Sequence, residues 1–171
     1  MSIRRLGLND EDALRAFVSD FATSGEERIP ALFVDPAWSF REVVERFAAW
    51  ERGERLEEGW VASSTRFFFD GGRILGVYNL RHELTGWLRR CGGHVGYSVR
   101  PSARDQGHAT ELLSDAIEAA RRLRIDRLLV TCSESNAASA RVIEKCGGTF
   151  QNVVACEDNR PTRRYWIDVE S

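Results

Sequence analysis

Apolar residues recur at a helical period in the first fifty positions of the chain. This period predicts a helix that follows a cap at Asn9 or Asp10, and a second helix that begins after Ser39, which has capping-box spacing to Glu42. A short strand, residues 3–8, precedes both. The apolar stripes of the two helices consist of Leu14, Phe17, Val18 and Phe21, and of Phe40, Val43, Val44, Phe47 and Trp50.

From Trp60 the pattern changes to β-branched and aromatic runs, and Asp70-Gly71-Gly72 predicts a hairpin between two of them. Later runs predict alternating strands and helices. The predicted elements are strands 60–69, 73–81 and 94–100, helix 108–123, strand 127–132, helix 137–145 and strands 149–155 and 163–169. This order favours an α+β fold in one domain, residues 1–171. Its mixed, mostly antiparallel sheet is flanked by helices, and strand 94–100, the next helix and strand 127–132 form a parallel unit.

Composition excludes some partners. The formal charge is −2 with dispersed basic residues, which does not indicate nucleic-acid binding. No apolar signal core or membrane span is visible, so we expect a cytoplasmic, reduced protein. The four cysteines lack metal-ligand spacing with the histidines, so we expect free buried thiols and no metal site. The cysteines are Cys91, Cys132, Cys146 and Cys156.

The segment from Gly93 to Gly148 carries the most specific chemistry. A strand, a Pro turn and an Arg-x-x-Gly-x-Ala loop lead into a long helix, whose first amides and dipole stabilise an anion. Gly107 and Ala109 are small enough to let a diphosphate approach those amides. Arg104 adds a charge-assisted bond to the ligand, orders the loop, or is simply exposed. The spacing fits neither the dinucleotide fingerprint nor a P-loop.

These residues resemble the acetyl-CoA-binding core of the GNAT family of N-acetyltransferases. The resemblance rests on "YSVRPSARDQGHATELL" and "SESNAASARVIEKCGG". It implies that Tyr97, Ser98 and Val99 offer main-chain bonds to the pantetheine arm where two strands separate. It also implies that amides from Asp105 to Thr110 bind the diphosphate. The residues so assigned to the cofactor are Tyr97, Ser98, Val99, Arg104, Asp105, Gln106, Gly107, His108, Ala109, Thr110, Asn136 and Ser139.

Two features of the last motif leave alternatives open. Asn136 bonds the pantetheine, caps the following helix, or does both. Ile143 stands where many family members carry a tyrosine that protonates the leaving thiolate, as in relatives that acetylate ribosomal-protein N-termini. A thiol of pKa about 8.5 leaves easily, whereas deprotonating an amine of pKa about 10.4 costs roughly 4 to 5 kcal/mol at neutral pH. The general base is therefore the more consequential catalyst.

Arg81-His82-Glu83 ends the strand where the base is expected. Glu83 is the first choice, directly or through a water, and His82 is the second because its ordinary pKa suits proton transfer. Both are equally well explained as surface residues at a strand end. His94 lies on the opposite face by alternation, and His108 is expected to be exposed. Cys132 is expected to be a buried structural thiol rather than an acyl carrier.

The sequence thus predicts an acetyl-CoA-dependent N-acetyltransferase. A bound primary amine attacks the thioester directly, and a main-chain amide near Val99 stabilises the oxyanion. The acceptor is a small amine or a protein N-terminus, walled by the first two helices and residues 84–92, and a homodimer is possible. The alternatives are a non-catalytic acyl-CoA-binding module and a nucleotide-binding regulator. Trp38, Trp50, Trp87 and Tyr165 are candidates for the acceptor wall, although packing explains each.

Overall fold

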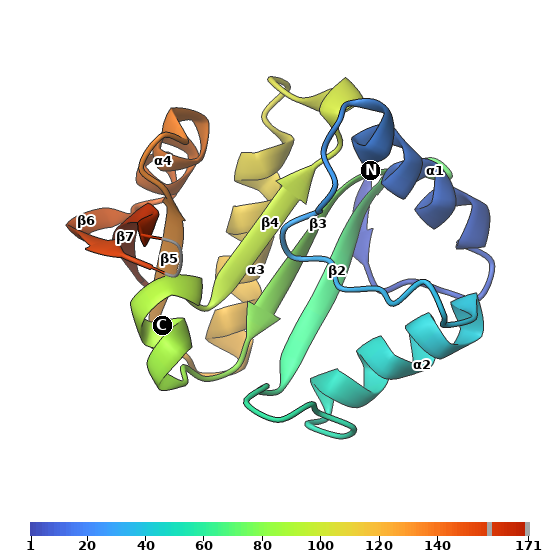
Figure 1. The fold of residues 1–171 in the computed structure, drawn as a ribbon, viewed down its shortest axis with the longest axis horizontal. Coiled ribbons are helices and arrows are strands. Elements are labelled where there is room, and N and C mark those ends of the chain that lie inside the picture. The colour runs from blue at the N-terminus through green and yellow to red at the C-terminus, as the bar shows by residue number, and fades with distance from the viewer. Residues whose placement is uncertain (157–158, 170–171) are drawn as a thin grey trace.

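The sheet runs through the whole molecule in the order β1-β2-β3-β4-β5-β7-β6 (Figure 1). The computed structural model describes residues 1–156 and 159–169, and within them the sheet has seven strands. The strands are β1 (Ser2–Arg4), β2 (Ser63–Asp70), β3 (Arg73–Arg81), β4 (Val95–Val99), β5 (Arg127–Ser133), β6 (Thr149–Ala155) and β7 (Pro161–Asp168). Only the β4–β5 neighbours in this sheet are parallel, which confirms the predicted mixed α+β architecture.

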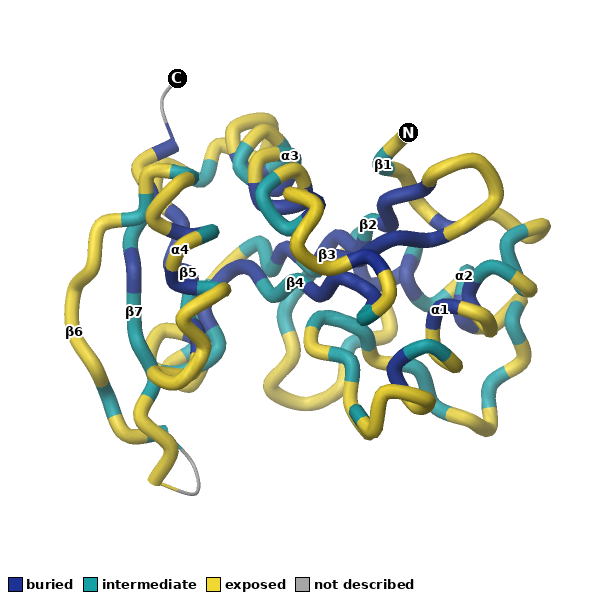
Figure 2. The backbone as a smooth tube through the Cα atoms, turned by 90° about the horizontal axis from the view of Figure 1, so that it is seen from above, coloured by how far each residue is buried: buried dark blue, intermediate teal, exposed yellow. Residues whose placement is uncertain are grey.

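Helices cover both faces of the sheet (Figure 2). They are α1 (Glu11–Thr23), α2 (Phe40–Glu51), α3 (His108–Arg122) and α4 (Ala137–Lys145). The helices α1 and α2 bury Phe17, Phe47 and Trp50 against one face of β2 and β3. The helices α3 and α4 bury Leu112 and Ile143 against the other face. These are the apolar stripes that the helical period predicted, so burial of alternate strand faces sets the layer order.

Local signals in the sequence agree with most element boundaries. The capping box at Ser39 and Glu42 is present at the start of α2. The first strand ends at Arg4 instead of continuing to Leu8. Asp10 precedes α1 but does not cap it with its side chain, because that carboxylate accepts bonds from Arg4 and from the amide of Gly7. The connection after β3, residues 84–92, contains a short π-helix at Leu88–Gly92.

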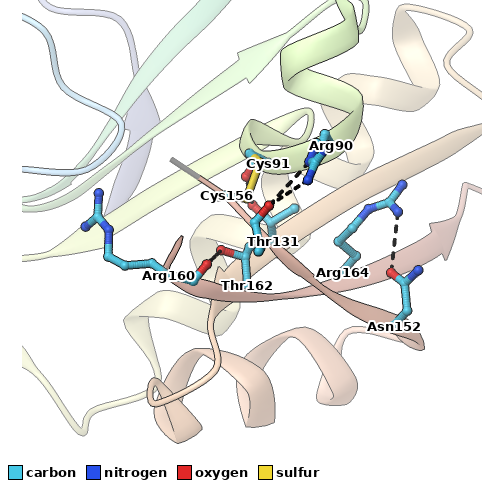
Figure 3. Close-up of a disulfide and its surroundings, with 9 residues drawn as sticks. Arg90, Cys91, Thr131, Asn152, Cys156, Arg160, Thr162 and Arg164 are labelled. Carbon is cyan, nitrogen blue, oxygen red and sulfur yellow. Dashed lines mark hydrogen bonds between the residues drawn. A yellow bond between two sulfur atoms is a disulfide. The ribbon is translucent and has the colours of Figure 1, made fainter. Parts of the chain in front are cut away.

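The expectation of four free thiols is wrong for two of the cysteines. Cys91 and Cys156 form a disulfide that joins the connection after β3 to the segment after β6 (Figure 3). Arg90 reinforces the same junction by donating to the carbonyl of Ala155. The two cysteines lie 65 residues apart, and sequence spacing carries no signal for a pair brought together only by the sheet order. Cys132 is a buried free thiol, as predicted, and Cys146 is free and half-buried.

Strands β4 and β5 pair at one position and then separate. Their ladder consists of Val95 opposite Val130. Just before it, the amide of His94 donates to the Leu129 carbonyl at 2.7 Å, and the imidazole Nδ1 of His94 accepts from the Leu129 amide at 2.9 Å. Gly93 has a φ of 65°, and a Cβ there would lie 2.6 Å from the Leu129 oxygen. A glycine is therefore required for this close approach, after which β4 diverges from β5.

None of the helices in the described part of the chain is long and apolar enough to cross a bilayer.

The buried His94 makes the strand junction sensitive to acid. Burial, followed by the neighbouring Arg89 and Arg81 charges, lowers the pKa of His94 to about 4. The unfolded chain, with an ordinary histidine pKa near 6.5, takes up this proton first as the pH falls. Stability from this group is therefore complete above about pH 6.5 and is lost towards pH 4, by about 3 kcal/mol.

We expect His94→Asn, which keeps an acceptor for the Leu129 amide but does not titrate, to have a flatter stability profile between these pH values. Urea unfolding of both proteins across this pH range measures the difference. Equal slopes for the two proteins would show that His94 is not the group responsible.

Candidate active site

A cavity of about 490 Å³ lies beside the diverging end of β4. The start of α3 and the start of α4 form its other walls, together with residues from α1 and from the segment that follows it. Every residue predicted to bind the cofactor, except Gln106, lines this cavity. The lining residues are Phe21, Glu26, Pro30, Tyr97, Ser98, Val99, Ala103, Arg104, Asp105, Gly107, His108, Ala109, Thr110, Asn136, Ala138, Ser139, Arg141, Val142 and Lys145.

The N-terminus of α3 opens into this cavity. Gly107 precedes the helix with a φ of 85°, and Asp105 also has a positive φ, 61°. This turn leaves the cavity side of the helix start free of a capping side chain among the described residues. The first amides of a helix have no intrahelical acceptors and carry a partial positive charge. The loop therefore has the features of an anion site, and its binding of a diphosphate stays a prediction.

Main-chain groups of β4 face the gap between β4 and β5. The Arg100 amide donates to the Leu75 carbonyl, and the Arg81 amide donates to the His94 carbonyl. These two hydrogen bonds lie at opposite ends of the antiparallel ladder between β3 and β4 and show which residue pairs along it are hydrogen-bonded. Because such pairs alternate, the N–H and C=O groups of Tyr97 and Val99 point away from β3. Those of Ser98 point towards β3, and its hydroxyl donates to the Pro30 carbonyl. Tyr97 and Val99 thus present an edge to which a pantetheine amide can hydrogen-bond.

Ionic contacts from α1 and the segment after it hold residues 100–107, the loop before α3, which we call the phosphate loop. Asp20 accepts from the Ser102 amide at 3.0 Å and from Arg100 at 3.3 Å. Burial alone would raise the pKa of Asp20, but these hydrogen bonds outweigh it and lower the pKa to about 2. Arg104 donates to the Val99 carbonyl and forms an ion pair with Glu26 at 2.8 Å. Of the roles left open for Arg104, the structure shows loop ordering at the edge of the cavity.

His108 is not exposed, contrary to the expectation from its position in a loop. Its side chain is 7% exposed and contacts Phe68 edge-on, with ring centroids 5.3 Å apart. The first turn of α3 lies on the sheet, so its inward residue is buried even though the loop before it is open. His108 therefore anchors the helix start that the diphosphate would occupy.

The start of α4 forms the opposite wall of the cavity. The Asn136 side chain accepts from the Ser139 amide at 3.0 Å, so Asn136 caps this helix. The Ser139 hydroxyl lies 2.7 Å from the Tyr97 hydroxyl, which bridges β4 and α4. Burial raises the pKa of Tyr97 to about 12. Ile143 is fully buried in the core, so the position of the usual tyrosine is filled by packing.

A second cavity, of about 470 Å³, lies on the face of the sheet covered by α1 and α2. Its walls are aromatic: Phe33 and Trp60 have centroids 5.2 Å apart, and Trp50 and Trp60 are equally close. The lining residues are Ala31, Leu32, Phe33, Phe47, Trp50, Glu58, Gly59, Trp60, Val61, Ser63, Thr65, Asn79, Arg81, Thr85, Trp87 and Leu88. We call it the acceptor cavity.

Two cross-strand pairs form the polar floor of the acceptor cavity. Ser63 lies opposite Arg81, and Thr65 lies opposite Asn79. Asn79 Nδ2 donates to Thr65 Oγ1 at 3.1 Å, and Arg81 Nη1 donates to the carbonyls of Gly92 and Gly93. Because side chains alternate along a strand, these four face the cavity together.

His82 and Glu83 follow the last residue of β3 and do not line the cavity. His82 Nε2 lies 2.8 Å from the Ser64 hydroxyl, and alternation puts both on the other face of the sheet from Arg81. Burial, more than any neighbouring charge, lowers the pKa of His82. Glu83 is exposed and lies in the bend after β3, where strand alternation no longer sets the direction of a side chain. Its neighbours in the chain, Arg81 and Thr85, both line the acceptor cavity.

Part of the lining of this cavity comes from segments that the sequence assigned to the acceptor wall. Helix α2 and residues 84–92 contribute Trp50 and Trp87, whereas α1 lines only the cofactor cavity, through Phe21. Phe33 was missed because it lies in a segment without periodicity, and Trp60 because it was assigned to the start of a strand. Tyr165 is buried outside the acceptor cavity. No cluster of three or more His, Cys, Asp or Glu side chains within residues 1–156 and 159–169 could hold a metal ion.

Gly107 offers a direct test of the anion site, because a side chain there would project where the diphosphate is expected. We expect Gly107→Leu to weaken acetyl-CoA binding at least about tenfold, measured by titration calorimetry. Gly71→Leu is the matched control, since Gly71 also has a positive φ and open space around it but lies in the β2–β3 hairpin. Both variants carry a similar backbone strain of about 1–2 kcal/mol. Equal affinities for both would contradict the assignment.

Comparison with known proteins identifies the family. A family model described as the acetyltransferase (GNAT) domain matches residues 1–149. No curated protein matches the chain in sequence. Among solved structures, the chain is similar to yncA of Salmonella typhimurium, determined with its cofactor acetyl-CoA, at 17% identity over 99% of this chain and 94% of that one, with a TM-score of 0.65.

It is also similar to a spermidine N-acetyltransferase of Vibrio cholerae, at 17% identity, 99% and 95% coverage and a TM-score of 0.65. A ribosomal-protein-alanine N-acetyltransferase of Brucella melitensis matches at 15% identity, with 98% and 99% coverage and a TM-score of 0.64. At these identities the structures share a fold with this chain. Because the family model covers most of the chain, the chain belongs to the GNAT family and is an acetyltransferase whose co-substrate is acetyl-CoA, as its motifs predicted.

Proposed function

We propose that the protein transfers the acetyl group to the primary amine of a small molecule bound in the acceptor cavity. The observation that carries this proposal is the position of the two cavities. Pro30 lines the cofactor cavity and the next residue, Ala31, lines the acceptor cavity. A Cβ built on Gly96 of β4 would meet Ala31 at 3.4 Å, so this segment packs on β4 between the two cavities. A thioester that passes beside β4 would reach the amine there.

The chemistry we propose is direct attack. The amine nitrogen forms a bond to the thioester carbonyl carbon, the carbonyl oxygen becomes an oxyanion, and the thiolate of coenzyme A leaves. Of the β4 amides that point away from β3, the Tyr97 amide lies next to Gly96 and would donate to that oxyanion, in place of the amide nearer Val99 that the sequence suggested. A preorganised donor of this kind often makes the largest single catalytic contribution. A thiol leaves readily near neutral pH, so the step needs no tyrosine at position 143.

Glu83 is the general base that we propose, acting through a water. It is exposed to solvent and lies between Arg81 and Thr85, which both line the acceptor cavity. His82 is the second choice, because its lowered pKa keeps it neutral but its imidazole is engaged with Ser64 on the other face.

The volume of the acceptor cavity, about 470 Å³, is typical of small-molecule sites and favours a small acceptor over a protein N-terminus. The names of the similar proteins include both kinds of acceptor, spermidine and a ribosomal protein. A non-catalytic acyl-CoA-binding module is the second candidate, and the observation that favours it is Ile143 in place of the tyrosine.

A single domain over residues 1–171, a cytoplasmic location and a homodimer stay predictions. Disulfides are uncommon in reducing compartments, so Cys91–Cys156 makes the location worth testing by cell fractionation. Light scattering tests the homodimer.

The test of the function is release of the coenzyme A thiol in the presence of a panel of amines. We expect acetyl-CoA to bind and at least one small primary amine to cause stoichiometric thiol release with an acetylated product in mass spectra. Tight binding without release for every amine and N-terminal peptide would favour the module instead. Competition by ATP or NAD would favour a nucleotide-binding regulator.

The role of Glu83 is tested by Glu83→Gln in the same assay. We expect kcat to fall about a hundredfold near neutral pH, with recovery at high pH where the amine loses its proton unaided. His82→Gln is the matched control and should retain most of the activity. An unchanged kcat in Glu83→Gln would show that the proton leaves by another route.

A further inference from the structure

The floor of the acceptor cavity contains a cation without an anionic partner. Arg81 is half-buried, and no carboxylate of the described residues lies within ion-pair distance of it. Its hydrogen-bond partners among the described residues are the neutral carbonyls of Gly92 and Gly93. Arginine residues in the molecule commonly have carboxylate partners, as Arg66 does with Glu51. Burial lowers the pKa of Arg81, and no neighbouring carboxylate raises it.

The guanidinium of Arg81 has donors to spare. Both carbonyls accept from Nη1, which leaves the hydrogens of Nε and Nη2 without an acceptor among the described residues. Neither nitrogen is a fully buried polar atom, and Arg81 lines the acceptor cavity. Nε and Nη2 form the fork that binds a carboxylate through two parallel bonds. The cavity thus offers a bidentate anion site at its floor.

The remaining charge and shape of the cavity select among anions. Glu58 is the other charged residue that lines it, and it is exposed, so solvent screens its effect. The walls are rings of Phe33, Trp50, Trp60 and Trp87, which favour an aromatic or bulky apolar body. A polyamine would place its positive charges beside Arg81 and gain no partner there.

The geometry along β3 connects the anion site to the reaction centre. Asn79 lies opposite Gly96, on which the segment between the two cavities packs. Arg81 is two residues further along β3, about 7 Å away. An acceptor held by its carboxylate at Arg81 can therefore present a nearby amine to the thioester. An α-amino acid has its amine and its carboxylate on one carbon, which suits this arrangement.

We propose that the acceptor is a free amino acid with an aromatic or bulky apolar side chain, and that Arg81 determines this specificity by binding its carboxylate. This inference rests on the proposed function, because it names the substrate class of the same cavity. A peptide N-terminus lacks the α-carboxylate and would be a poor acceptor.

The test compares acceptors that differ only in that group: L-phenylalanine, L-phenylalaninamide and phenethylamine, with spermidine as the polyamine. We expect kcat/KM for phenylalanine to exceed that for the amide by at least about tenfold, since a charge-assisted hydrogen bond is lost. The amide has the less basic amine, so amine basicity alone would give the opposite order. Equal or better transfer to the amide, or a preference for spermidine, would overturn the proposal.

Arg81→Gln should remove the preference for the acid over the amide, mainly through KM, and leave acetyl-CoA affinity unchanged. A merely structural role of Arg81 would lower transfer to all acceptors alike. Arg89→Gln is the matched control, because Arg89 is an exposed cation nearby that does not line the cavity, and it should keep the preference.

A binding experiment separates this inference from the proposed function. Trp50, Trp60 and Trp87 line the cavity, so their fluorescence reports occupancy without turnover. Saturable binding of phenylalanine that Arg81→Gln abolishes, without thiol release for any amine, would contradict the proposed function and support the anion site. Neither binding nor transfer of phenylalanine at millimolar concentration would refute the anion site, whether or not another amine is acetylated.

Discussion

The separation of β4 from β5 is the constraint on which the active site depends. A parallel pair normally satisfies the main chains of both strands along their length, and here the pairing stops after Val95 and Val130. His94 and Gly93 hold the strands together just before that point. As a result, the main-chain N–H and C=O groups of Tyr97 and Val99 have no neighbouring strand to pair with. The extended amide chain of pantetheine is a ligand that can satisfy them, which ties the fold to its co-substrate.

The same divergence organises what surrounds it. On one face of the sheet, α3 and α4 pack against the strands. The start of α3, which has no side-chain cap, lies at the gap between β4 and β5. On the other side, the chain between α1 and α2 crosses β4, with Ser98 bonded to Pro30, and divides the cofactor cavity from the acceptor cavity. The contacts of Asp20 and Glu26 with the phosphate loop fix one wall relative to the other. One irregularity in the sheet thus places the two cavities on either side of a single segment.

Sequence analysis succeeded where the determinants are local. Periodicity, the capping box at Ser39 and the Asp70-Gly71-Gly72 turn located nearly every element. The loop motif selected residues that line one cavity, because many of them are adjacent positions of one turn and one helix. The rest depends on contacts distant in the sequence. The Cys91–Cys156 disulfide, the burial of His108 on Phe68 and the joining of Phe33 with Trp60 arise only when the sheet order is known. Arg81 was visible as a strand-end residue, but its lack of an anionic partner was not.

The most direct measurement of the central claim is a crystal structure of the protein with acetyl-CoA bound. The account predicts the pantetheine between β4 and β5, bonded to the main chain of Tyr97 and Val99, and the diphosphate on the amides of residues 105–110. The thioester should reach the boundary of the two cavities beside Gly96. A cofactor bound outside this gap, or a β4 that closes onto β5 in the complex, would contradict it.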